Sequence, residues 1–247
     1  MRAAATGTDL TPEQQSVADA GLKALIPVAG GKTLLEFMVE NLRSAGFSDI
    51  CLVIGPEHDA IRDFCAEKDL DVSFAIQNEP KGTADAVIAA EEFIDRDELF
   101  LVVNSDNHYP VDSLRRLREV NRPAMLAFDR ESLIEKSNIA EDRIAKFATV
   151  EVGDDGMMKR IIEKPAIVDP SHFVSMNAWL FPPEIFAACR AIGPSERGEF
   201  EIPTAVQYAI NELGIEFAAV KTREGILDLS SRTDIATAAS KLISESN

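Results

Sequence analysis

The sequence is poor in cysteine and has no long apolar run, and each shortage excludes a class of protein. Its 247 residues include three cysteines, Cys51, Cys65 and Cys189, an odd number with no close pair. That pattern argues against a disulfide framework and a zinc site. No apolar run reaches the roughly 18–20 residues that span a membrane, and no basic-then-apolar signal peptide opens the chain. We therefore expect a cytoplasmic protein with reduced thiols and no membrane contact.

Positive charge is also scarce. The chain has 25 Lys and Arg residues against 42 Asp and Glu residues, and its formal net charge is -17. Such an acidic balance argues against a nucleic-acid surface, although a few lysines in a cleft can still bind an anionic substrate. The apolar content of 46% is ample for a sizeable core, and the length allows one α/β domain or two small ones.

Strand and helix patterns alternate through the first half. Continuous apolar runs bounded by glycine and proline predict buried parallel strands, and amphipathic stretches between them predict helices. The predicted strands are 50–54, 72–76, 99–103 and 124–128, and the predicted helices are 33–45, 58–67, 82–93 and 112–120. This order is typical of a Rossmann-like, doubly wound and mostly parallel sheet in a three-layer α/β/α fold. Such sheets bind ligands outside the carboxyl ends of their strands.

The second half is less regular. Two strands around Gly153-Asp154-Asp155-Gly156 predict a hairpin. The remaining predicted elements are strands 173–181 and 217–220 and helices 183–191, 203–213 and 231–244. Ser231 and Asp234 approximate a capping box at the start of the last helix.

A predicted strand end, turn and helix start between Gln77 and Thr83 could hold a nucleotide base. Glutamine offers both a donor and an acceptor, which suits the edge of a base. Gly82 would let a flat ring approach the backbone closely. An ordinary loop followed by a helix start is the alternative.

Two carboxylates and a lysine extend the candidate site. Asp106 follows an apolar strand, where a carboxylate is well placed for Mg²⁺ beside a phosphate; an Asx turn is the alternative. Asp228 lies between an apolar segment and a helix, where it either completes that metal site or only starts the helix. Lys164 precedes Pro165, which favours extended geometry, and its ammonium either binds a phosphate or lies in solvent.

The chain resembles the sugar-1-phosphate nucleotidylyltransferases, the family that includes uridylyl- and thymidylyltransferases. Eight motifs carry the resemblance in the family's order, from about residue 21 to 235. They lie at 22–28, 45–50, 77–84, 105–106, 163–165, 176–178, 198–202 and 228–234. Leu22 replaces a family proline and Ser105 a family glycine, whereas Glu163-Lys164-Pro165 is intact.

The resemblance implies a role for each matched residue. Lys23 and Lys164 would contact phosphates, and Gln77, Gly82 and Thr83 would hold the base. Glu163, Asn177 and Glu199 belong to motifs of the sugar-phosphate side, where Asn177 and Glu199 would contact the sugar. Asp106 and Asp228 would bind Mg²⁺.

The implied substrates are a nucleoside triphosphate, with UTP or dTTP favoured, and a sugar 1-phosphate. The sugar-phosphate oxygen attacks the α-phosphorus directly and needs no general base, so His58, His108 and His172 are expected to be structural or at the surface. We expect one nucleotidyltransferase domain over 1–247, with a nucleotide half at 21–145 and a sugar-phosphate half at 146–247. A non-catalytic nucleotide-sugar-binding homologue is the alternative, and the oligomeric state is open.

The start of the chain departs from the family pattern, which opens with a strand and a glycine-rich phosphate loop. Aligning that loop with residues 3–12 puts Asp9 in place of an arginine, facing a triphosphate that it would repel. Taking Met1 as the residue after the loop makes residues 3–20 an insertion. We expect a wrongly assigned or truncated start, with the central strand and its loop preceding Met1; a degenerate loop is the alternative. Without that anion cradle, the chain as given could be inactive.

Overall fold

The computed structural model describes residues 17, 22–229 and 234. The predicted last helix, except Asp234, and the segment 3–12 lie outside the described residues. The elements predicted between residues 33 and 220 are present, and their boundaries agree to about two residues with one exception. The predicted helix 82–93 ends at Ala89, and a separate 3-10 segment covers residues 91–93. In the described part of the chain, no helix is long and apolar enough to cross a membrane.

A six-stranded sheet forms the centre of the molecule, and its long strand β10 (Phe173–Phe181) organises it. One edge of β10 pairs with β7 (Ala124–Phe128). The other edge pairs with β8 (Thr149–Val152) near its start and with β5 (Phe100–Val102) near its end. Beyond these, β11 (Ala218–Thr222) pairs with β7, and β9 (Met158–Ile162) pairs with β8.

The sheet is mixed, whereas the sequence predicted mostly parallel pairing. Only β11 and β7 run parallel in the central sheet, because β10 is antiparallel to each of its three partners. A continuous apolar run indicates a strand buried on both faces, but it does not encode the direction of the strand beside it. The α/β class is confirmed, and among the described strands the parallel character is confined to two pairs.

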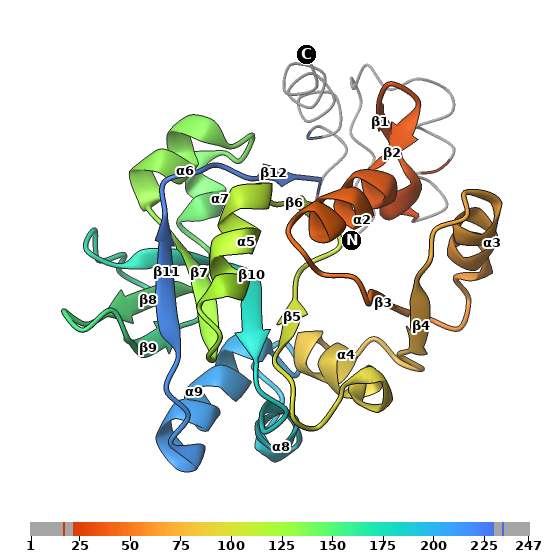
Figure 1. The fold of residues 1–247 in the computed structure, drawn as a ribbon. Helices are drawn as coiled ribbons and strands as arrows, with labels where there is room; N and C mark the ends of the chain where they lie inside the picture. Colours follow the sequence, from red (N-terminus) through yellow and green to blue (C-terminus); the bar gives the residue numbers. More distant parts are fainter. Residues whose placement is uncertain (1–16, 18–21, 230–233, 235–247) are drawn as a thin grey trace.

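The second parallel pair is β3 (Cys51–Ile54) with β4 (Ser73–Ile76), which form a separate two-stranded sheet. Within the described residues β3 has no other strand partner, and β5 pairs only with β10. Figure 1 shows the β3–β4 pair beside β5 and α4 without joining the central sheet. Val53 is 36% exposed, so this apolar run is less buried than its composition predicts.

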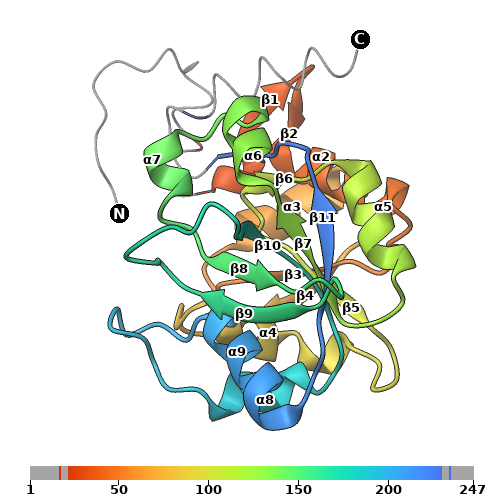
Figure 2. The same cartoon turned by 90° about the vertical axis from the view of Figure 1, so that its left-hand side faces the viewer.

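Helices cover both faces of the central sheet, which gives the predicted three layers (Figures 1 and 2). Alternate residues of a strand point to opposite faces, and β7 shows this directly. Met125 packs into the core shared with α4 (Thr83–Ala89), α8 (Ile185–Ala191) and α9 (Ile202–Leu213). Leu126 packs on the opposite side with α5 (Val111–Glu119) and Leu133 of α6 (Arg130–Lys136).

Helix α2 (Leu34–Ser44) begins at a capping box that links Thr33 and Glu36. The box satisfies backbone N–H groups that would otherwise lack partners at a helix start. A β-hairpin, β1 (Pro27–Ala29) and β2 (Lys32–Thr33), leads into this helix. Between residues 22 and 229 the other helical segments are η1 (Lys23–Leu25), α3 (Asp59–Glu67), η2 (Glu91–Phe93) and α7 (Glu141–Ile144).

Candidate functional site

Gln77 follows β4 and is fixed within its own segment. Its side-chain Nε2 lies 3.1 Å from the carbonyl oxygen of Gly82 and 2.8 Å from Oδ2 of Asp85, and it donates to both. Its backbone N–H donates to Ile54 at the end of the neighbouring strand β3, at 2.9 Å. The amide therefore has one defined orientation at the carboxyl end of the β3–β4 pair.

Gly82 is required for a reason other than the one expected from the sequence. Its φ is +123°, and a Cβ at this position would lie 2.4 Å from the backbone oxygen of Phe200. The close neighbour that needs glycine is therefore another stretch of the chain, whereas we had expected the ring of a base. Phe200 donates its N–H to Lys81 and accepts from the N–H of Ala84, at 2.8 and 2.9 Å.

Thr83 strengthens the same contact. Its hydroxyl accepts a hydrogen bond from the backbone N–H of Ile202 at 3.0 Å, at the start of α9. The motif at 77–84 is thereby clamped to the motif at 198–202, although more than a hundred residues separate them. Thr83 has a structural role here that the sequence did not indicate.

Asp106 and Asp228 are brought to the same place by the pairing of two short strands. β6 (Asn107–His108) runs antiparallel to β12 (Leu227–Asp228), with Asn107 opposite Asp228. The carbonyl oxygen of Asp106 accepts from the N–H of Leu229 at 2.8 Å. Burial raises the pKa of Tyr109 well above its ordinary value, a bond from the Asn104 N–H opposes the rise, and the charges of Asp106 and Asp228 add to it.

Asp228 is almost fully buried, and both of its carboxylate oxygens are hydrogen-bonded. Arg143 donates to Oδ1 at 2.7 Å, and Asn107 donates to Oδ2 at 3.0 Å. Arg143 also reaches Asp234 at 3.0 Å. The backbone of Asp228 is held by Asn138, which accepts from its N–H and donates to its carbonyl oxygen, each at 2.8 Å.

The donor set at this place fits a hard divalent cation. Two carboxylates are ligands of the type that Mg²⁺ prefers, and Mg²⁺ commonly takes one or two carboxylates and leaves other positions to substrate phosphates. Asn107 turns its NH₂ group to Asp228, and its Oδ1 accepts from the Tyr109 hydroxyl and the Asn104 amide. Among the described residues no group of three or more His, Cys, Asp or Glu side chains could hold a metal. A cation here would compete with Arg143 for Asp228.

Glu163 and Lys164 follow β9. Lys164 is exposed and has a φ of +44°, so it is not held in the extended geometry that a following proline favours. A non-glycine residue in this region carries backbone strain, which is common at functional sites. Burial raises the pKa of Glu163, and the Glu201 carboxylate adds to the rise, whereas Lys164 and Arg197 oppose it.

Glu199 and Glu201 have opposite environments. Glu199 is exposed and lies 3.5 Å from the Arg197 guanidinium. Glu201 is 7% exposed, accepts hydrogen bonds from Arg197, and receives one from the Ser195 hydroxyl at 3.3 Å. The neighbouring carboxylate that helps to raise the pKa of Glu163 is therefore Glu201, which the sequence interpretation did not select.

Asn177 interrupts β10. Its φ is +55°, and the register of β10 against β7 shifts between Ser175 and Trp179. Its Oδ1 accepts a hydrogen bond from the Trp179 indole at 3.3 Å. Because bulges re-aim side chains and are frequent next to functional sites, this geometry suits the predicted sugar contact.

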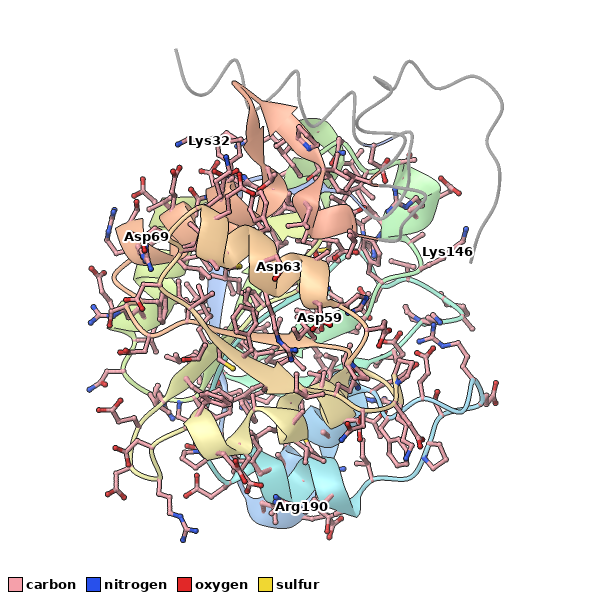
Figure 3. The ribbon with its side chains drawn as sticks, turned by 90° about the vertical axis from the view of Figure 1, so that its right-hand side faces the viewer. Lys32, Asp59, Asp63, Asp69, Lys146 and Arg190 are labelled. Atoms are coloured by element: carbon pink, nitrogen blue, oxygen red, sulfur yellow. The ribbon has the colours of Figure 1, made fainter. Side chains whose placement is uncertain are left out.

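Lys23 begins η1, and its side chain lies outside the described part of the structure. The nearby Lys32 points outward beside α2 (Figure 3) and pairs with Glu40 at 2.6 Å. The three cysteines are free thiols. Of the histidines, His108 is half-buried and structural, because the Asn41 amide lies 2.8 Å from its Nε2.

Comparison with known proteins identifies the family of the chain. The model of the nucleotidyl transferase family matches residues 6–245, so the chain belongs to that family. It is 32% identical over 214 residues to a glucose-1-phosphate thymidylyltransferase of Streptomyces griseus, covering 85% of this chain and 56% of that protein. It is 30% identical over 213 residues to the UTP–glucose-1-phosphate uridylyltransferase AglF of Haloferax volcanii, covering 84% and 81%.

The chain thus spans little more than half of some relatives and most of others. Among solved structures, a UDP-glucose pyrophosphorylase complexed with UDP-glucose superposes with a TM-score of 0.70 at 19% identity, covering 90% of each chain. The apo form of UDP-glucose pyrophosphorylase superposes with a TM-score of 0.73 at 17% sequence identity. These structures establish the likeness of fold.

Proposed function

We propose that the chain catalyses nucleotidyl transfer from a nucleoside triphosphate, UTP or dTTP, to a sugar 1-phosphate. The observation that carries the proposal is the pairing of β6 with β12, which sets Asp106 beside Asp228 in a member of the nucleotidyl transferase family. The clamp between residues 81–84 and 200–202 supports it, because its backbone and Thr83 hydrogen bonds join the base segment to a motif of the sugar-phosphate side.

The reaction would proceed by direct displacement. An oxygen of the sugar phosphate attacks the α-phosphorus, the bond between that phosphorus and the bridging oxygen breaks, and pyrophosphate leaves. The attacking oxygen is already an anion, so the protein aligns reactants and neutralises charge without a general base. Mg²⁺, which Asp106 and Asp228 would hold, would neutralise phosphate charge when bound.

Each remaining residue has a proposed part. Gln77 contacts the base, Lys164 and Lys23 contact phosphates, and Glu163 and Asn177 face the sugar phosphate. The exposure of Glu199 suits a contact that forms only when substrate is present. The proposed substrates also make the cytoplasm our proposed location.

The test is pyrophosphate release from UTP, dTTP, CTP, ATP and GTP, each with a panel of sugar 1-phosphates. We expect Asp106→Asn to lower kcat by about 100- to 1000-fold, because charge at the phosphates is no longer neutralised. The matched control is Asp112→Asn, which removes an exposed carboxylate that pairs with Arg115 at 2.5 Å and leaves turnover unchanged. Binding of a nucleotide sugar without turnover of any triphosphate would favour the non-catalytic alternative.

A further inference from the structure

The side-chain amide of Gln77 is fixed by two groups that can only accept hydrogen bonds. These are the carbonyl oxygen of Gly82 at 3.1 Å and the carboxylate of Asp85 at 2.8 Å. An amide oxygen placed between two acceptors would be repelled by both, so the NH₂ group must lie there. The orientation therefore follows from the chemistry of the partners alone.

The two contacts use both hydrogens of the NH₂ group. What Gln77 still offers to a ligand is its carbonyl oxygen, which accepts and cannot donate. Asp85 lies on the first turn of α4 and is partly buried, so it meets the strand end across the turn. Gln77 and Asp85 also line one hollow of about 250 Å³ between β4, the turn and α4.

We infer that Asp85 is a specificity-determining residue. Its carboxylate holds the NH₂ group of Gln77, so only the amide oxygen, which accepts hydrogen bonds, faces the base. This inference rests on the proposed function and deepens it. Uracil and thymine carry an N–H between two carbonyl groups on their pairing edge and complement a lone acceptor. Cytosine and adenine present a bare ring nitrogen at the matching position, so two lone pairs would face each other. Unpaired polar groups in such a site reduce binding strongly.

Asp85 acts through Gln77, so its test must distinguish positioning from folding. The experiment is equilibrium binding of UTP and CTP by calorimetry, without sugar phosphate, to the wild type and to three variants. The variants are Gln77→Glu, Asp85→Asn and the two combined. We expect the wild type to bind UTP at least about 30-fold more tightly than CTP.

Gln77→Glu alone places a carboxylate against Asp85 and loses both donors, so we expect UTP binding to weaken by about 30-fold or more. Adding Asp85→Asn supplies an amide donor to the new carboxylate, whose second oxygen can again accept from the base. We therefore expect the combined variant to recover about tenfold of that loss and to keep its preference for UTP. Losses that simply add would overturn the inference.

Glu79→Gln is the matched control. Glu79 lines the same hollow, carries the same charge and pairs with Lys81 at 2.9 Å, but it has no bond to Gln77. We expect it neither to change the UTP preference of the wild type nor to rescue Gln77→Glu. Equal rescue by Glu79→Gln would show that net charge is responsible, and the inference would be wrong.

The two proposals fail in different ways. A wild type that neither binds UTP nor releases pyrophosphate from it contradicts the proposed function and this inference together. A wild type that turns over UTP, with a combined variant no better than Gln77→Glu, contradicts only the role of Asp85. Far-UV circular dichroism of each variant confirms that every comparison is between folded proteins.

Discussion

The two ends of the candidate site are built in different ways. At the base end, Gln77 is held by residues five and eight positions along the chain. At the carboxylate end, Asp228 is held by Asn107 and Arg143, which lie 121 and 85 positions away. The base end therefore takes its side-chain geometry mainly from a local turn, whereas the carboxylate end exists only once distant segments have packed.

The difference has an energetic consequence. A local turn brings its partners together at little loop-closure cost, but pairing across a hundred residues depends on the rest of the fold. Changes at the carboxylate end should therefore reduce global stability, whereas changes to side chains at the base end should mainly alter binding. The contacts of Gly82 with Phe200 and of Thr83 with Ile202 are the exception, because they tie the base end to a distant segment.

The largest expected effect comes from disrupting the close approach of Gly82 to Phe200. Gly82→Ala adds a Cβ 2.4 Å from the Phe200 carbonyl oxygen, at a φ of +123°. Backbone strain and the clash with backbone atoms together should lower the free energy of unfolding by about 4 kcal/mol, measured by urea denaturation. The control is Gly214→Ala, where φ is +66° and nothing lies within 4 Å, with an expected loss of about 1 kcal/mol. Equal losses at both sites would show that the close approach costs nothing.

The next effect tests the carboxylate end. Arg143→Met removes a guanidinium that donates to Asp228 at 2.7 Å and to Asp234 at 3.0 Å. Because the buried Asp228 carboxylate would lose the guanidinium that donates to its Oδ1, we expect a loss of about 3 kcal/mol in urea denaturation. Arg122→Met, which breaks an exposed pair with Glu216, should cost less than about 1 kcal/mol. Similar losses for both variants would contradict the claim that the carboxylate end depends on contacts between segments distant in the sequence.

The smallest effect concerns pH. Burial lowers the pKa of His108 from 6.5 to about 4 in the folded protein. Between these values the unfolded chain binds more protons than the folded one, so stability rises with pH and is lost as pH falls from about 6.5 to 4. The wild type should lose about 2–3 kcal/mol across this window beyond the loss of His108→Gln, which cannot titrate but can still accept from Asn41. Parallel stability–pH curves for the two proteins would contradict this assignment.

Strands β7 and β3 show how much of the fold the sequence could predict. The apolar run 124–128 was correctly predicted as a strand, and every residue of β7 is buried. The run 50–54 was also correctly predicted, yet β3 is partly exposed because it has β4 as its one strand partner in the described chain. The pattern of a strand is a local property, but its burial depends on what lies on both sides.

The site shows the same limit. Gln77 was selected for the donor and acceptor of its amide, Gly82 for the close approach it permits, and Thr83 by the family resemblance. Asp106 and Asp228 were selected as carboxylates that follow apolar segments. Asp85 could have been selected from the sequence, because it is an acidic residue on the first turn of the helix predicted to begin at Gly82. Glu201 lies within the motif at 198–202 but was not selected. No local signal marks Arg143 or Asn107, because their importance comes from partners far along the chain.

The sequence by itself determined the element types, the α/β class, the family motifs and the acidic character, because these depend on local periodicity, turn chemistry and composition. Only the tertiary structure decided that β10 runs antiparallel to its neighbours and that Gly82 accommodates a distant backbone. It also decided that Asp228 meets Arg143. Strand direction, close approach and charge pairing are relations between segments, and a single segment does not encode its partner.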